Sequence, residues 1–165
     1  MRKLIFIASS IILSSSFSQF VYSKSGDLFI NGYVNVKNSV DGYVLTKEMF
    51  DTMSKSSIKT STSWTPKGQP VNFEGVKIKD ILKLVEAKGE TLRVHALNDY
   101  WVDIPVTDVN TYDIILATKM DGKPLQVRDF GPYFVIYPVD SYPTKLNSPI
   151  YLSRFIWQVD KITVM

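Results

Sequence analysis

Apolar and polar residues alternate along much of this chain, which is the pattern of β-strands with one buried face. Residues typical of turns separate the alternating runs, as at Asp41-Gly42, Asn98-Asp99 and Asp121-Gly122. The pattern predicts strands over residues 27–36, 57–63, 91–97, 100–105, 114–120, 125–128, 133–137 and 155–164. The first of these strands is expected to kink at Gly32.

Helical spacing is limited to short segments. Apolar residues at positions 76, 78, 81, 82 and 85 predict an amphipathic helix over 76–86. Thr46 is placed to cap a short helix that begins at Lys47, and Thr107 to cap a further helical turn. Loops are predicted over residues 65–70 and 138–150. Because strands dominate and do not alternate with helices as βαβ units, we predict a mixed, β-rich α+β fold.

The first residues have the features of a secretory signal peptide. Arg2 and Lys3 precede a mostly apolar run over residues 4–13, and small residues follow. A run of this length is too short to cross a bilayer, which takes roughly 20 residues. The competing interpretation of the same run is a buried N-terminal strand.

A signal peptide predicts export. We expect cleavage after Ser18 or Ser23, so that residues 1–23 are removed and residues 24–165 form a single domain. The mature chain is expected to have no membrane span, and to be periplasmic or secreted.

The chain contains no cysteine. Disulfides, cysteine-based zinc or iron–sulfur sites and thiol chemistry are therefore excluded. The single histidine, His95, cannot build a histidine cluster for a metal, although it could act as an acid or base. Apolar residues make up 45% of the chain, which is enough for a core without covalent cross-links.

The charge of the chain excludes a nucleic-acid partner. The formal net charge is +3, from 19 basic and 16 acidic residues, and it falls to +1 once Arg2 and Lys3 are removed. The basic residues are scattered among acidic ones, whereas phosphate-backbone binding needs a basic patch. The sequence also lacks a Gly-x-Ser-x-Gly nucleophile turn and a glycine-rich phosphate loop.

Several short segments occur in a recognisable order. They are Phe73-Glu74-Gly75-Val76, Asn98-Asp99-Tyr100, Asp121-Gly122-Lys123-Pro124, Gly131-Pro132 and Trp157-Gln158-Val159. In this order and spacing, residues 56–164 resemble the molybdopterin-binding domain of the sulfite-oxidase family of oxidoreductases. The resemblance implies a sulfite-oxidase-like fold and, in active members, a molybdenum atom held on a pterin cofactor.

The chain departs from this family where the metal is bound. In the family, one cysteine in a loop just after a strand completes the sulfur coordination of molybdenum. The matching stretch, residues 59–64, offers only the hydroxyls of Thr60, Ser61, Thr62 and Ser63. A protonated, hard hydroxyl oxygen is a poor replacement for thiolate at a soft metal site, although some other molybdenum proteins do use a serine ligand.

A second departure concerns an arginine. After the Gly-x-Pro segment the family usually supplies an arginine that helps to hold the cofactor phosphate, whereas here Gly131-Pro132 is followed by Tyr133. An aromatic ring cannot replace a guanidinium group that binds an anion. Arg128 and Arg154 lie near in sequence and could substitute, or could be solvated surface residues.

The resemblance places a candidate cleft beside the loops at 59–64 and 98–101. The candidate ligand-binding residues are Ser61, Thr62, Ser63, Trp64, His95, Asn98, Asp99, Tyr100, Arg128 and Tyr133. Tyr and Trp suit such a site because they combine apolar area with a polar group, but they also fill β-sheet cores. The alternatives for Asn98, Asp99 and His95 are ordinary turn chemistry and a structural imidazole. We predict no catalytic residue and no metal ligand.

These observations favour an exported, catalytically degenerate binding module. Its partner is expected to be a small polar ligand or a protein such as a membrane-bound sensor. No cofactor is expected, and molybdopterin enters only through the resemblance. The alternatives are a molybdopterin-dependent oxidoreductase with hydroxyl or water ligation of the metal, and a purely structural interaction protein.

Overall fold

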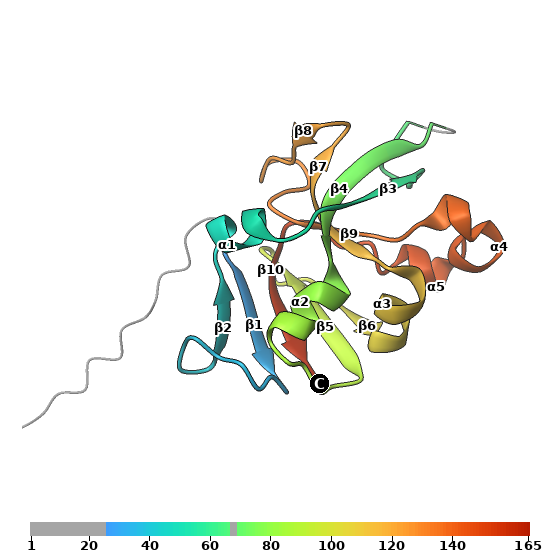
Figure 1. The fold of residues 1–165 in the computed structure, drawn as a ribbon. Helices are drawn as coiled ribbons and strands as arrows, with labels where there is room; N and C mark the ends of the chain where they lie inside the picture. The colour runs from blue at the N-terminus through green and yellow to red at the C-terminus, as the bar shows by residue number, and fades with distance from the viewer. Residues whose placement is uncertain (1–25, 67–68) are drawn as a thin grey trace, which may run out of the picture.

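The fold is built from two β-sheets, seen in Figure 1, in a computed structural model that describes residues 26–66 and 69–165. Within these residues each sheet has five strands. The predicted signal peptide, residues 1–23, lies outside the described part of the chain. The predicted β-rich α+β fold with few short helices is confirmed.

The first sheet has the C-terminal strand at its centre (Figure 1). Its strands, in order across the sheet, are β2 (Gly42–Leu45), β1 (Leu28–Gly32), β10 (Val159–Val164), β5 (Thr91–Ala96) and β6 (Trp101–Pro105). β1 and β10 are parallel, and the other pairs are antiparallel. Gly32, at φ +86°, permits the close approach of β1 and β10, because a Cβ there would lie 2.0 Å from the carbonyl oxygen of Val164.

The second sheet is entirely antiparallel. Its strands, in order, are β3 (Ser56–Thr60), β4 (Val71–Lys77), β7 (Ile115–Met120) and β8 (Lys123–Pro124), with β9 (Phe134–Ile136) also paired to β7. β3 is an edge strand, because β4 is its one strand neighbour among the described residues. Among the described residues, one side of β3 therefore has no hydrogen-bonded strand neighbour.

Short helices connect the strands. In the described part of the chain they are α1 (Lys47–Thr52), α2 (Ile78–Leu84), α3 (Val106–Tyr112), the 3₁₀-helix η1 (Val139–Ser141), α4 (Pro143–Leu146) and α5 (Pro149–Leu152). Thr46 caps α1 as predicted, since its Oγ1 accepts a hydrogen bond from the N–H of Met49 at 3.2 Å. Among these residues no helix has the length and apolar character that crossing a bilayer would require.

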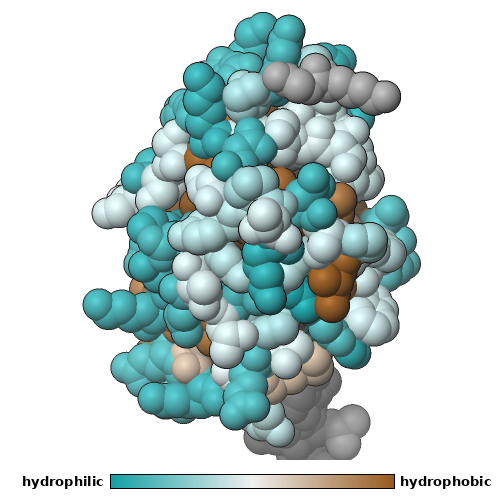
Figure 2. All heavy atoms as spheres, turned by 90° about the vertical axis from the view of Figure 1, so that its right-hand side faces the viewer, coloured by the Kyte–Doolittle hydropathy of each residue, from teal (hydrophilic) through white to brown (hydrophobic). Residues whose placement is uncertain are grey.

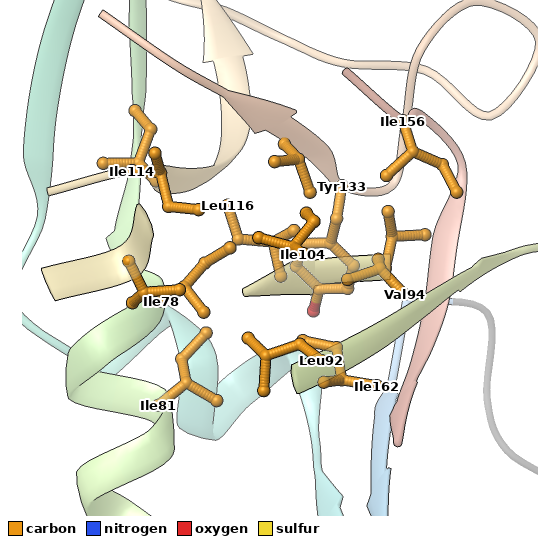
Figure 3. Packing of buried hydrophobic residues seen from close by; sticks show 14 of the residues in the cluster. Ile78, Ile81, Leu92, Val94, Ile104, Ile114, Leu116, Tyr133, Ile156 and Ile162 are labelled. Atoms are coloured by element: carbon orange, nitrogen blue, oxygen red, sulfur yellow. The ribbon is translucent and has the colours of Figure 1, made fainter. Parts of the chain in front are cut away.

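The two sheets and α2 share one hydrophobic core. Figure 3 shows Ile78 and Ile81 of α2 beside Leu92 of β5 and Leu116 of β7, and all four side chains are fully buried. Tyr133 lies in the same cluster. Burial of apolar surface on this scale is the main stabilising contribution to the fold, at roughly 25 cal/mol per Å² removed from water.

The structure corrects several predicted elements. β2 and β4 are strands that the alternation did not predict, and the helix expected over 76–86 begins at Ile78, after β4 has ended at Lys77. β4 pairs with β3 and β7 in the second sheet, so its apolar residues have the spacing of a strand and not that of a helix. The first two predicted strands are also shorter than expected, because β1 ends at Gly32 and β3 at Thr60.

Two further predictions were wrong. Residues 125–128 form turns and not a strand, because the N–H groups of Asp129 and Gly131 both donate to the carbonyl of Gln126. Residues 138–150 were predicted as a loop, but they contain η1, α4 and the start of α5. Pro143 and Pro149 each occupy the first turn of one of these helices, where the missing N–H of proline has no cost.

Candidate functional site

The loop after β3, where the family resemblance places the metal ligand, is bound to η1. We call residues 60–65 the hydroxyl loop. Thr60 is fully buried, and its Oγ1 accepts a hydrogen bond from the N–H of Asp140 at 3.2 Å. Ser61 donates to the carboxylate of Asp140 twice, from Oγ to Oδ1 at 2.6 Å and from its N–H to Oδ2 at 2.9 Å. A ligand that binds the Ser61 hydroxyl would therefore have to compete with the carboxylate of Asp140.

The rest of the hydroxyl loop is closed by its own hydrogen bonds. Thr65 Oγ1 donates to the carbonyl of Thr62 at 3.0 Å and accepts the N–H of Thr62 at 2.9 Å. Thr62 Oγ1 accepts the N–H of Trp64 at 3.2 Å. Such side-chain-to-backbone bonds are typical of tight turns. Three of the four hydroxyls that could replace the family's cysteine, those of Thr60, Ser61 and Thr62, thus already have a partner within the chain.

Trp64 anchors the end of this loop on an aromatic cluster. Its ring centroid lies 5.1 Å from that of Trp157, 5.9 Å from Phe155 and 6.0 Å from Phe134. Phe134 is stacked in turn on Phe130, with centroids 5.3 Å apart. Trp64 remains 37% exposed, so it covers the buried rings and still presents one side to solvent.

The turn at residues 98–101 joins β5 to β6. Asp99 has a φ of +64°, and the side-chain oxygen of Asn98 accepts the N–H of Tyr100 at 3.2 Å. These are the properties of a tight hairpin turn, in which Asn and Asp are favoured. Tyr100 and Trp101 are both exposed.

His95 lies on β5, between its cross-strand neighbours Trp101 and Lys161. Partial burial lowers the pKa of His95, and the positive charges of Lys161 and Arg93 lower it further. The guanidinium of Arg93 covers the ring of Trp101 at 3.9 Å and makes two hydrogen bonds of 2.9 Å to Asp103. The imidazole is therefore a half-buried part of a structured sheet face.

The structure links the two predicted loops through a segment between them. Trp157 contacts Trp64 of the hydroxyl loop, and the carbonyl of the next residue, Gln158, accepts the N–H of Leu97, which directly precedes the 98–101 turn, at 3.0 Å. Arg128 is 85% exposed and lies beside Asp129.

Tyr133, in contrast, is a core residue and only 1% exposed. Its ring lies 4.8 Å from Phe50, and its hydroxyl donates to the carbonyl of Gly26 at 2.5 Å. Burial raises the pKa of Tyr133, so its hydroxyl stays protonated.

Sequence reasoning missed a buried polar network. Arg154, which was compatible with a surface position, is mostly buried and pairs with Asp108 at 2.5 Å. Tyr137 donates to the same carboxylate oxygen of Asp108 at 3.0 Å. Asp140, the partner of Ser61, was missed as well. The sequence carries no signal for either contact, because the partners are 29 to 79 residues apart and the segment after β9 was predicted as a loop.

Two shallow, open pockets lie among the described residues, and neither is lined by a predicted site residue. The first, of about 320 Å³, lies between the first residues of β3 and the segment after β9, and we call it the β3 pocket. Its lining includes Ser56, Lys59, Lys77, Tyr112, Asp113 and Tyr142. The second, of about 370 Å³, lies between α2 and α3 and includes Lys79 and Lys83.

The chain matches a protein-family model. Residues 46–139 match the family described as the oxidoreductase molybdopterin binding domain. The chain belongs to this family. The match includes the hydroxyl loop, α2, the 98–101 turn and β7, and it ends at the first residue of η1.

A solved structure has the same fold as this family member. The structure is the sulfane dehydrogenase SoxCD from Paracoccus pantotrophus, which superposes with a TM-score of 0.61 at 17% sequence identity. The superposition covers 84% of this chain but 37% of the SoxCD chain, so this chain spans well under half of that protein. The predicted sulfite-oxidase-like fold is thereby confirmed. No curated protein matches the chain.

The residues at the expected metal position do not fit the family's metal centre. The hydroxyl loop offers no thiolate, and Asp140 and backbone groups already bind Thr60, Ser61 and Thr62. Among residues 26–66 and 69–165, no three His, Asp or Glu side chains gather as a possible metal site. A soft metal centre prefers sulfur, so binding here would require both a hard ligand and the loss of existing hydrogen bonds.

Proposed function

We propose that this chain is an exported binding module of the molybdopterin-binding family that does not carry out molybdenum redox chemistry. The hydroxyl loop is the observation that carries this proposal. Where the family resemblance requires a thiolate, Ser61 is hydrogen-bonded to Asp140 and Thr62 closes a turn with Thr65. These bonds stabilise the folded loop and compete with any metal for the same oxygen atoms.

The remaining surface is suited to binding. The aromatic rings around Trp64 offer apolar contacts. The lining of the β3 pocket, on a neighbouring part of the molecule, offers polar contacts. We propose a small polar ligand as the primary partner, with docking to a membrane-bound sensor protein as the alternative. Export follows from the signal-peptide features of residues 1–23.

Metal analysis tests the absence of redox chemistry. The protein should be purified from cells that make molybdopterin and are supplied with molybdate. The molybdenum-to-protein ratio should then be measured by mass spectrometry, together with pterin fluorescence after denaturation. We expect both to be far below one equivalent. The matched variant Ser61→Cys returns a thiolate to the loop, and it should raise the molybdenum content if the missing sulfur is the limiting factor.

The rival function is a molybdopterin-dependent oxidoreductase with a hydroxyl or water ligand, which the family match favours. Stoichiometric molybdenum in the unmodified protein, together with electron transfer from sulfite or to a sulfoxide, would replace our proposal with this one. Export has a separate test. Cell fractionation should place the protein outside the cytoplasm, with an N-terminus near residue 19 or 24 by mass spectrometry, and an uncleaved cytoplasmic chain would refute it.

A further inference from the structure

We propose that the β3 pocket binds a small aromatic carboxylate. This inference rests on the proposed binding function and adds a site and a ligand class to it. The pocket adjoins the hydroxyl loop without including it, because Lys59 lines the pocket and none of residues 60–65 does. Three properties of the pocket support the proposal: its charge, its donors that lack a protein partner among the described residues, and its two tyrosine rings.

The charge of the pocket is positive. Lys59 and Lys77 line it together with a single carboxylate, Asp113. Lys77 pairs with Asp113 at 2.7 Å, and Lys79 contacts its other oxygen. These two lysines lower the pKa of Asp113, so the carboxylate stays ionised and its charge is compensated locally. The ammonium of Lys59 is left as excess positive charge, which favours an anionic ligand.

Solvent-facing donors without a protein partner among the described residues surround this charge. Among the described residues, no hydrogen bond is made by the ammonium of Lys59 or by the side-chain hydroxyls of Ser56, Ser141 and Tyr142, and all four residues line the pocket. Asp140, which precedes the lining residue Ser141, has its carboxylate bound to Ser61. Several donors around one ammonium match the acceptor oxygens of a carboxylate better than they match a cation or a neutral apolar molecule.

Two tyrosine rings give the pocket an aromatic side. The rings of Tyr112 and Tyr142 meet edge to face, with centroids 5.2 Å apart. A hydrogen bond with Tyr151 raises the pKa of Tyr112 to about 12, and a tyrosine is neutral near pH 7 even at its ordinary pKa of 10.0. Its position is fixed from behind, because Tyr151 also contacts Tyr137 and lies under the guanidinium of Arg154. A planar ligand can pack against such rings in an offset or edge-to-face arrangement.

The size of the pocket favours a small ligand. Its volume of about 320 Å³ is near the lower end of the range for small-molecule sites, roughly 300–1,000 Å³. Figure 2 shows the side of the molecule that carries α4 and α5, where the surface is mostly hydrophilic and hydrophobic residues form small, separate patches. That surface is a poorer match for an apolar protein partner than for a small anion.

The experiment compares three probes by isothermal titration calorimetry with the purified protein. They are benzoate, which has both ring and charge; benzamide, which has the same shape without the charge; and acetate, which has the charge without the ring. We expect saturable binding of benzoate with a Kd on the order of 1 mM. Benzamide and acetate should each bind at least about tenfold more weakly, since each lacks one of the two features.

Variants locate the site by effects of opposite sign. Lys59→Met should weaken benzoate binding by about tenfold or more, and Lys59→Arg should restore most of it. Asp113→Asn should strengthen binding by a few fold, because it removes a repelling charge and frees Lys77. Asn tolerates the left-handed backbone of position 113, where φ is +51°. Lys83→Met, in the pocket between α2 and α3, is the control and should change nothing.

Three results would each overturn the inference. Benzoate fails to bind, benzamide binds as well as benzoate does, or Lys59→Met leaves benzoate binding unchanged. Measuring molybdenum on the same preparation keeps this failure distinct from that of the proposed function. A molybdenum-free protein that ignores benzoate loses only the ligand assignment, whereas a stoichiometric metal content removes the binding-module proposal itself.

Discussion

The β3 pocket and the hydroxyl loop that follows it along the chain make different use of their polar side chains. The hydroxyl loop directs its hydroxyls to Asp140 and to its own backbone. Along residues 56–59, the β3 pocket holds the Lys59 ammonium and the Ser56 and Tyr142 hydroxyls, and none of these groups makes a hydrogen bond among the described residues. A polar group that is already hydrogen-bonded contributes to folding, whereas one that has kept its water can exchange it for a ligand. The comparison therefore indicates a stabilising role for the loop and supports the proposal that the pocket binds a ligand.

The largest expected effect comes from the network behind the pocket. Arg154→Ala would leave Asp108 buried without its charge partner, so we expect a loss of about 3 kcal/mol in the free energy of unfolding, measured by urea denaturation. Arg128→Ala, an exposed control, should cost less than about 0.5 kcal/mol. If the two variants were equally stable, Arg154 would not be the buried support that the pocket requires.

The next effect concerns the aromatic anchor of the hydroxyl loop. Trp64→Ala removes a ring that packs on Trp157, Phe155 and Phe134, and because the ring is partly exposed we expect a loss of about 2 kcal/mol. Trp64→Phe should recover about half of it. Benzoate binding should persist in both variants, since Trp64 does not line the β3 pocket. Loss of benzoate binding in a folded Trp64 variant would show that loop and pocket are one site.

A smaller change in stability tests the hydrogen bonds between Ser61 and Asp140. Ser61→Ala removes the hydroxyl bond to Asp140 but keeps the bond from the backbone N–H, so we expect a loss of about 1 kcal/mol. Ser63→Ala is the matched control on the same loop, and it should be nearly neutral because Ser63 is exposed. Equal denaturation midpoints for the unmodified protein and Ser61→Ala would contradict a stabilising role for the hydrogen bond from the Ser61 hydroxyl to Asp140.

The smallest effect is a pH dependence at the pocket. Lys77 and Lys79 lower the pKa of Asp113 below its ordinary value of 3.8. The stabilisation from these pairs is fully present above pH 3.8 and disappears as the pH falls through the lower, folded-state value. Because the Asp113 side chain is 45% exposed and solvent screens its ion pairs, we expect Asp113→Asn to cost less than about 1 kcal/mol at pH 6.

Thermal unfolding at several pH values between 2.5 and 6 checks this last expectation, with pH steps chosen to bracket the ordinary value of 3.8. The difference between the unmodified protein and Asp113→Asn should shrink toward acid. Asp41→Asn, at an exposed turn, serves as control and should show no such trend. A difference that grew as the pH fell would mean that the lysines do not stabilise the ionised carboxylate.

Local patterns in the sequence predicted the elements that depend on nearby residues. The strands that became β5, β6, β7 and β10, and the cap of α1 at Thr46, follow from alternation and from one hydroxyl at a helix start. The turn at Asp99 was also evident, because its left-handed backbone favours Asp. β4 was hidden because its apolar residues run directly into those of α2, so two periods overlap near Gly75 and Val76.

By itself, the sequence determined the β-rich fold, the family resemblance and the absence of any cysteine thiolate, because these depend on residue type and order. The tertiary structure alone decided what the remaining polar groups do. It joined Ser61 to Asp140 across 79 residues, buried Arg154 against Asp108, and gathered Lys59, Tyr112 and Tyr142 around one pocket. Such pairings have no local signal, because they arise from the packing of segments that are far apart in the chain.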